Sequence, residues 1–153
     1  MILVDTNVFA IDLRYPHDRL AATNRAFLDR LAVHGDGATT LYNVLELAGI
    51  LSFNLSPRQL QDLVATFAPR YRIRVLPALD RALGLPTPTV GALLERMARR
   101  CALGDAQVLA AAEQVADREA AFVSWDAERF VGRTALRVAT PAEWLASDGL
   151  AAP

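Results

Sequence analysis

Four acidic residues, spread over most of the chain, are the side chains best suited to chemistry. They are Asp5, Glu46, Asp105 and Asp126. Each follows a predicted strand or lies near the start of a predicted helix, and in a parallel sheet these points share one edge. Carboxylates brought together repel one another unless a cation lies between them. Clusters of oxygen ligands suit Mg²⁺ or Mn²⁺, which can activate a water for attack on a phosphate.

Each of these residues also has a purely structural interpretation. Asp5 could cap a turn, Asp105 could be a helix N-cap after Gly104, and Asp126 could cap the short helix that follows it. Glu46 has mostly apolar neighbours, so we expect its helix to be mostly buried, and a buried glutamate needs a partner. The convergence of all four at one predicted edge favours a shared site.

The pattern of apolar residues predicts strands that alternate with helices. Residues 1–4 form an apolar run without alternation, typical of a strand buried on both faces, and Asp5 follows it. Residues 12–18, which include Asp12, Arg14 and Pro16, are interpreted as a loop. Further strands are predicted at residues 38–42, 71–76, 120–125 and 136–139, the second of them nearer an edge.

Helices are predicted over residues 19–33, 44–52, 57–68, 89–102, 105–117 and 127–130, and from residue 141. Asn43 and Ser56 are the expected N-caps of the second and third, and the third should end before Pro69. Residues 77–89 are rich in proline, so any helix there should be short. The alternation predicts an α/β protein whose parallel sheet has helices on both faces.

Composition excludes several kinds of chemistry. All 16 basic residues are Arg, so a phosphate-loop lysine, a Schiff-base lysine and a lysine general base are excluded. The single cysteine, Cys101, allows no intrachain disulfide or thiolate cluster and is expected to be a small buried hydrophobe. With only two histidines, a zinc site is not expected. The net charge of −1 gives no global basic field for nucleic acid.

The chain begins without the pattern of a secretory signal, because Asp5 interrupts the apolar start. No apolar run reaches the length needed to span a membrane. We therefore expect a soluble, cytoplasmic protein of 153 residues, a length that suits one domain.

Four short stretches carry a family resemblance. They are Val4-Asp5-Thr6-Asn7-Val8, Asn43-Val44-Leu45-Glu46-Leu47, Gly104-Asp105-Ala106-Gln107-Val108-Leu109-Ala110-Ala111-Ala112 and Val123-Ser124-Trp125-Asp126 with Phe130. In these stretches and in their order, which cover nearly the whole chain, the sequence resembles the PIN domain, in particular the VapC-type toxin ribonucleases.

The resemblance implies a three-layer α/β/α sandwich with a central, mostly parallel sheet of about five strands. It implies one nuclease domain over residues 1–147, followed by a frayed tail at 148–153. The implied activity is Mg²⁺- or Mn²⁺-dependent cleavage of single-stranded or loop RNA by a metal-activated water. The implied site is the acidic quartet of Asp5, Glu46, Asp105 and Asp126, with Thr6, Asn7 and Ser124 as polar supports. Family members often form homodimers and often pair with a small antitoxin that blocks the site.

Alternative interpretations apply to the basic residues and to the fold family. Arg14, Arg96, Arg99 and Arg100 are candidate phosphate contacts, although a solvated helix face is the simpler interpretation of each. A haloacid dehalogenase-type phosphatase is disfavoured by Asn7 and by the absence of lysine, and a Rossmann module by the missing Gly-rich turn. A PIN-like module that binds RNA or protein without cutting remains open.

Overall fold

The computed structural model describes residues 1–78, 84–85 and 87–148. Within this part of the chain, five parallel strands form one sheet in the order β3-β2-β1-β4-β5. The strands are β1 (Ile2–Val4), β2 (Gly37–Thr40), β3 (Arg74–Leu76), β4 (Ala121–Val123) and β5 (Arg137–Ala139). The first strand therefore lies at the centre of the sheet, and the alternating strand of the sequence prediction, β3, is an edge strand as expected.

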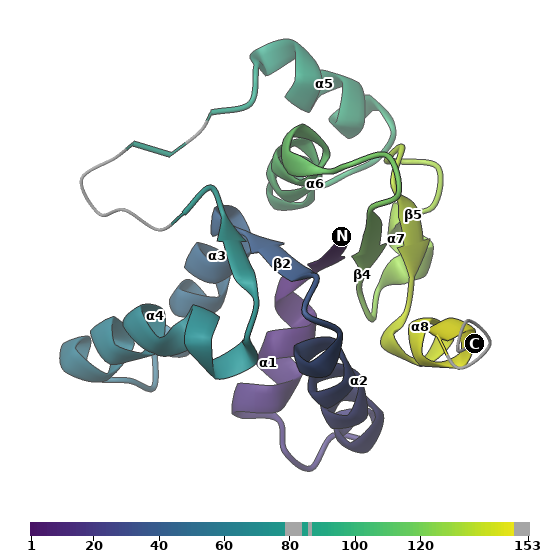
Figure 1. Cartoon of the computed structure of the whole chain (residues 1–153). Coiled ribbons are helices and arrows are strands. Elements are labelled where there is room, and N and C mark those ends of the chain that lie inside the picture. The colour runs from purple at the N-terminus through teal and green to yellow at the C-terminus, as the bar shows by residue number, and fades with distance from the viewer. Residues whose placement is uncertain (79–83, 86, 149–153) are drawn as a thin grey trace.

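Helices cover both faces of this sheet (Figure 1). They are α1 (Thr6–Arg14), α2 (Ala21–His34), α3 (Leu41–Ser52), α4 (Pro57–Tyr71), α5 (Val90–Ala98), α6 (Leu103–Val115), α7 (Ala127–Phe130) and α8 (Pro141–Asp148). Figure 1 shows α5 and α6 above the sheet and α1, α2 and α4 below it. The predicted α/β/α sandwich is confirmed, with a sheet that is parallel throughout.

Burial of the central strand on both faces divides the core in two. Ile2 and Val4 belong to a cluster shared with α1, α2, α3, α4 and α8. Leu3 points the other way, into a cluster with α6 and with Phe122 of β4, where Cys101 is buried as predicted. This alternation is the period-two geometry of a strand, and the apolar run at the start of the sequence exists because both faces are covered.

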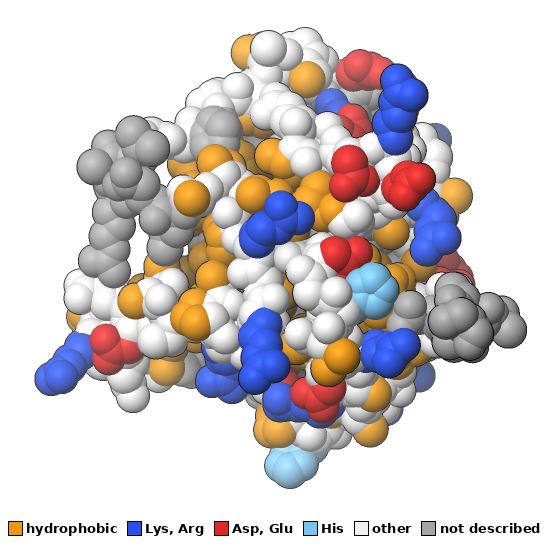
Figure 2. All heavy atoms as spheres, in the orientation of Figure 1, with side chains coloured by type: hydrophobic (Ala, Val, Ile, Leu, Met, Phe, Trp, Pro, Cys, Tyr) orange, Lys and Arg blue, Asp and Glu red, His pale blue; other side chains and the backbone are white. Residues whose placement is uncertain are grey.

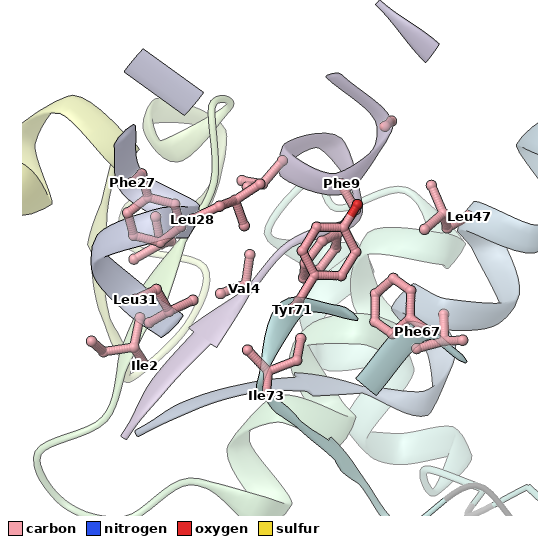
Figure 3. Close-up of a cluster of buried hydrophobic side chains, with 14 of the residues drawn as sticks. Ile2, Val4, Phe9, Phe27, Leu28, Leu31, Leu47, Phe67, Tyr71 and Ile73 are labelled. Carbon is pink, nitrogen blue, oxygen red and sulfur yellow. The ribbon is translucent and has the colours of Figure 1, made fainter. Parts of the chain in front are cut away.

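An aromatic group anchors the larger cluster, as Figure 3 shows. The ring centroids of Phe9 and Phe67 lie 4.8 Å apart, and those of Phe9 and Tyr71 lie 4.9 Å apart. The Tyr71 hydroxyl donates to Asp12 over 2.8 Å. Burial, and next the hydrogen bond to Asp12, raise the pKa of Tyr71. These contacts fix α4 against α1, the helix that begins at Asp5.

Three local predictions were wrong. Asp12 and Arg14 belong to α1 and not to a loop, because Val8, Phe9 and Ile11 bury one face of a regular helix. The loop that follows covers residues 15–20, before α2 begins.

The other two errors concern helix ends. The N-cap of α3 is Thr40, whose side chain accepts from Asn43 N, so the helix begins before Asn43. Pro69 lies inside α4, which continues to Tyr71. Proline lacks the N–H that a helix interior uses, and here the buried rings of Phe67 and Tyr71 hold the last turn.

Two further expectations are only partly covered. Residues 79–83 and 86 of the proline-rich stretch lie outside the described residues, as does the predicted tail beyond Asp148. The assignment of residues 1–147 to a single domain stays a prediction. In the described part of the chain, no helix is both long and apolar enough to cross a membrane.

Candidate active site

The acidic residues meet at the carboxyl edge of the sheet, beside the adjacent strands β1 and β4. The chain leaves β1 toward β2 on one side, whereas β4 and β5 lie on the other side. Such a reversal of strand order opens a crevice where ligands bind in α/β proteins. A pocket of about 200 Å³ lies here. Its polar lining consists of Asp5, Thr6, Asn7, Glu46, Asp105, Asp126 and Arg129. The predicted convergence of the four carboxylates at one edge is therefore observed.

Asp5 is the most deeply placed of these groups, with 8% of its surface exposed. Its Oδ1 accepts from Thr6 N at 2.8 Å, as the N-cap of α1, and from Asn43 Nδ2 at 3.1 Å. Its Oδ2 accepts from the Ser124 hydroxyl at 2.7 Å. The capping interpretation of Asp5 is thus correct, yet the same carboxylate also faces the pocket.

Burial raises the pKa of Asp5 from 3.8 to about 6. The hydrogen bonds from Ser124 and Thr6 oppose this shift, while the charges of Glu46 and Asp105 add to it. A carboxyl group that resists ionisation in this way would ionise readily beside a cation.

Ser124 connects the two central strands at the site. It is fully buried, and its hydroxyl accepts from Asn7 Nδ2 at 2.9 Å and from Asp126 N at 3.0 Å while donating to Asp5. The Asn7 side chain also accepts from Trp125 N at 3.1 Å. These bonds hold the turn after β4 against the start of α1, and so fix where Asp126 stands relative to Asp5.

Glu46 lines the pocket although its side chain is not buried. The residue is exposed, and so is its neighbour Leu45, whereas Leu47 is buried. Most of α3 is buried or half-buried as predicted, but the expectation that Glu46 is itself buried was wrong, because it lies on the exposed face of the helix. The partner of Glu46 is the Thr6 hydroxyl, which donates to its carboxylate.

Asn43 is a site residue that sequence reasoning missed. Its buried amide donates to Asp5 and, over 2.9 Å, to the Thr6 hydroxyl. The sequence predicts only a capping role for Asn43. Its place three residues before Glu46, on the same helix face, was the signal that it points toward the same edge.

Asp105 and Asp126 are not the side-chain caps that they resemble in the sequence. Asp105 lies in the first turn of α6, whose N-cap is Ala102. Asp126 occupies the N-cap position of α7, and its side chain makes no capping hydrogen bond among the described residues. Both instead face Arg129: Nη2 of Arg129 lies 3.2 Å from Asp105, and Nη1 lies 3.6 Å from Asp126.

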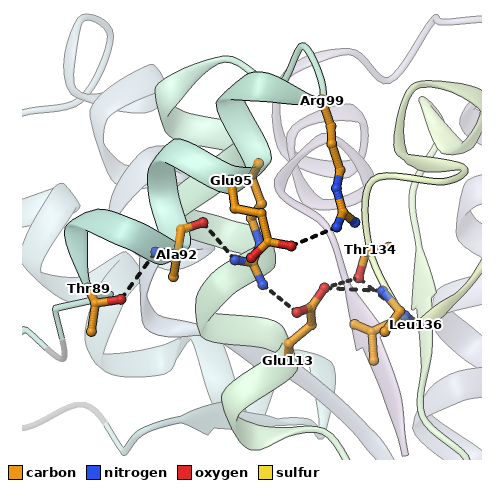
Figure 4. Close-up of polar contacts among 9 residues, drawn as sticks. Thr89, Ala92, Glu95, Arg99, Glu113, Thr134 and Leu136 are labelled. Atoms are coloured by element: carbon orange, nitrogen blue, oxygen red, sulfur yellow. Dashed lines mark hydrogen bonds and ion pairs between the residues drawn. The ribbon is translucent and has the colours of Figure 1, made fainter.

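The arginines proposed as phosphate contacts are not in this pocket. Among the described residues, its lining includes none of Arg14, Arg96, Arg99 and Arg100. Arg14 donates to the carbonyl of Ile50 at 2.8 Å. Arg96 pairs with Glu113 and Arg99 with Glu95, as Figure 4 shows. On the face seen in Figure 2, arginine and acidic side chains are interspersed.

The donor set fits a hard divalent ion by its chemistry, since it offers four carboxylates and no sulfur. Burial, and to a smaller extent the charges of Glu46 and Asp105, raise the pKa of Asp5, and a cation in the pocket would oppose this shift. Within the described residues, however, no three acidic, histidine or cysteine side chains stand close enough to ligate one ion together. Arg129 and Thr6 engage three of the four carboxylates, so ion binding requires side chains to turn inward.

Comparison with known proteins finds solved structures of similar fold. No family model and no curated protein sequence matches the chain. It is similar to FitAcB from Neisseria gonorrhoeae, with 21% identity and a TM-score of 0.61 over 93% of this chain and 99% of that one. It is also similar to FitAB bound to an IR36 DNA fragment, with 20% identity and a TM-score of 0.59 over 92% and 95% of the two chains.

A third similar structure is VapBC2 from Rickettsia felis bound to a DNA fragment from its promoter. Identity is 17% and the TM-score is 0.58, over 92% of this chain and 98% of that one. Together with the strand order and the helices on both faces, these similarities show that the chain has a PIN-like α/β/α fold, shared with these structures.

Proposed function

We propose that this protein is a divalent-metal-dependent endoribonuclease that cleaves single-stranded or loop RNA, and that it is the toxin of a toxin–antitoxin pair. The observation that carries the proposal is the meeting of four carboxylates, from four separate segments, in one pocket at the strand-order reversal. The single guanidinium of Arg129 balances at most one of these charges, so the pocket favours a further cation.

In this proposal the four carboxylates have different roles. Asp5, Asp105 and Asp126 would hold one or two Mg²⁺ or Mn²⁺ ions, and Glu46 would help hold an ion or orient the attacking water. The ion lowers the pKa of a bound water and neutralises charge that develops on a phosphate oxygen.

The polar residues around the quartet would act by positioning it. Ser124 directs Asp5 and, through its bond to the backbone of Asp126, sets the spacing of the two carboxylates. Asn7 holds Ser124, and Thr6 turns Glu46 toward the pocket. Groups fixed in this way lose little entropy when the reacting arrangement forms.

A small antitoxin protein is the proposed partner. FitAB and VapBC2, to which this chain is similar, were both solved bound to a DNA fragment, which for VapBC2 comes from their promoter. We propose an antitoxin that blocks the acidic pocket, and a homodimer of this chain.

A second reading is a PIN-like module that binds RNA or protein without cutting. The observation that favours it is the arrangement of the pocket, where three of the four carboxylates are engaged by Arg129 and Thr6.

The test is cleavage of labelled structured and unstructured RNA by the purified protein with Mg²⁺, Mn²⁺ or EDTA. Asp5→Asn should abolish metal-dependent cleavage, and Asp62→Asn, an exposed position on α4, should not. Full activity of Asp5→Asn would overturn the assignment of the site. If the folded, partner-free protein binds these RNAs and cleaves none of them in either metal, the non-catalytic reading replaces the nuclease.

A further inference from the structure

Arg129 is the basic side chain in the polar lining of the pocket. It comes from α7, a helix of four residues between β4 and β5, and reaches across to Asp105 on α6, which is 24 positions earlier. It also lies beside Asp126, three positions before it on the same turn. Two of the four carboxylates in the pocket therefore face a cation that belongs to the chain itself.

The guanidinium of Arg129 competes with a metal ion for those carboxylates. It keeps its charge at every physiological pH, and its planar array of donors suits carboxylate and phosphate oxygens alike. Arg129 contacts Oδ2 of Asp105 and Oδ2 of Asp126, so a divalent ion held by these two carboxylates would compete with it for them. The two cations would also repel each other at this distance, so the ion and the Arg129 bridge exclude each other.

The bridge is loose enough to be exchanged. The side chain of Arg129 is 56% exposed, that of Asp126 is 52% exposed, and the contact between them is a 3.6 Å ion pair. The contact to Asp105, at 3.2 Å, is the closer one. Ion pairs between exposed groups are weak, and the open side of Arg129 faces solvent, where a ligand would arrive.

We propose that Arg129 is a positioning residue that exchanges partners during the working cycle. Before an ion binds, it bridges Asp105 and Asp126 and keeps their charges neutralised. When an ion takes the carboxylates, the released guanidinium contacts a phosphate of the RNA at the rim of the pocket. This inference rests on the proposed function, and it assigns a phosphate contact to the pocket itself, whose lining among the described residues contains none of the four predicted arginines.

The first experiment measures binding of Mn²⁺ to the full chain without RNA, by calorimetry and by the fluorescence of Trp125, which precedes Asp126. Removal of a competing cation should tighten binding, and one exposed and one partly buried ion pair correspond to about a fivefold change. Arg129→Gln should therefore bind Mn²⁺ about fivefold more tightly than the wild type. The gain should shrink as salt is raised, since exposed charges are screened.

Arg118→Gln is the control of equal charge. Arg118 is exposed and lines a separate cavity of about 740 Å³ beside the start of β4, at the opposite edge of the sheet. Its variant should bind Mn²⁺ as the wild type does. Equal tightening in both variants would mean that net charge alone is responsible, and would overturn the exchange.

The second experiment measures binding of a non-cleavable RNA in the presence of Mn²⁺. Here Arg129→Gln should bind RNA several-fold more weakly, although its pocket holds the metal more tightly. Opposite changes in the two affinities are the signature of an exchanging residue, because a merely structural role would weaken both.

The outcomes separate this inference from the proposed function. Wild-type binding of Mn²⁺ that Arg129→Gln fails to tighten would overturn the exchange and leave the nuclease intact. No Mn²⁺ binding by the wild type or by the variant would overturn both.

Discussion

The Ser124 hydroxyl donates a 2.7 Å hydrogen bond to Oδ2 of Asp5, although the two residues stand 119 positions apart in the chain. This bond ties the end of β1 to the end of β4, its neighbour in the sheet. It also stabilises the charged form of a carboxyl group that burial would otherwise keep neutral. This one hydrogen bond therefore affects both the arrangement of the two strands and the pKa of Asp5.

Ser124→Ala should affect both the stability of the protein and the pKa of Asp5. Loss of this buried hydroxyl removes the bond to Asp5, the acceptor of Asp126 N and the closer of the two acceptors of Asn7 Nδ2. We expect the free energy of unfolding to fall by about 1–3 kcal/mol, and the pKa of Asp5 to rise further. Urea unfolding measures the first effect, and the pH dependence of Mn²⁺ binding measures the second. Ser52→Ala, which removes an exposed hydroxyl bonded to the Gly49 carbonyl, should cost far less.

Asp5 should also give stability a distinctive dependence on pH in the metal-free protein. Burial raises its pKa from 3.8 to about 6 in the folded state. Between these values the folded state binds more protons than the unfolded state, so the free energy of unfolding falls as the pH rises. The loss due to Asp5 should approach about 3 kcal/mol above pH 6.

Urea unfolding of the wild type and of Asp5→Asn in EDTA, at several pH values from 4 to 7, isolates this contribution. The amide that replaces the carboxyl group in Asp5→Asn cannot ionise, so the variant should gain stability relative to the wild type across that range. Curves that stay parallel would mean that Asp5 is already ionised at pH 4. Saturating Mn²⁺ should remove much of the wild-type loss, because it stabilises the ionised carboxylate.

Phe9 couples α1, and with it Asp5, to the larger core cluster. Its ring is fully buried between Phe67 and Tyr71. Phe9→Ala should lower the free energy of unfolding by about 3–5 kcal/mol through lost burial and a residual cavity. Phe53→Ala removes the same side chain from a position that is 89% exposed and should be almost neutral. Similar losses in both variants, measured by urea unfolding, would contradict the central place of the Phe9 cluster.

Local patterns in the sequence predicted the strands and most helices. The apolar run before Asp5 predicts a doubly covered strand, and β1 has its side chains in both core clusters. One failure involves residues that are distant in the sequence. Asp12 is predicted in a loop, yet its carboxylate is buried against Arg25, Arg70 and Tyr71.

In the site, too, the sequence predicts some residues and misses others. Parallel strands alone predict that Asp5, Glu46, Asp105 and Asp126 share an edge, and this prediction needs no strand order. Arg129 could not be found in this way, because its partner Asp105 lies on another helix. The spacing of three between Asp126 and Arg129 is common to many solvated ion pairs, so it carries no signal for a pocket.

Glu113 fixes α5 and the chain after α7 to α6. Its carboxylate pairs with Arg96 of α5 and accepts from the Thr134 hydroxyl at 2.5 Å and from Ala135 N at 3.2 Å (Figure 4). Arg96 is only 12% exposed, so the loss of its counter-charge leaves a mostly buried cation. Glu113→Gln should therefore lower the free energy of unfolding by about 2–4 kcal/mol.

Glu95→Gln is the matched control, since Glu95 pairs with Arg99 where both side chains are at least half exposed. That variant should change the free energy of unfolding by less than about 1 kcal/mol. Hydrogen exchange should show faster opening of α5 in Glu113→Gln, because its main polar tie to α6 is gone. Unchanged exchange in α5, together with equal stability of the two variants, would show that apolar packing alone holds this helix.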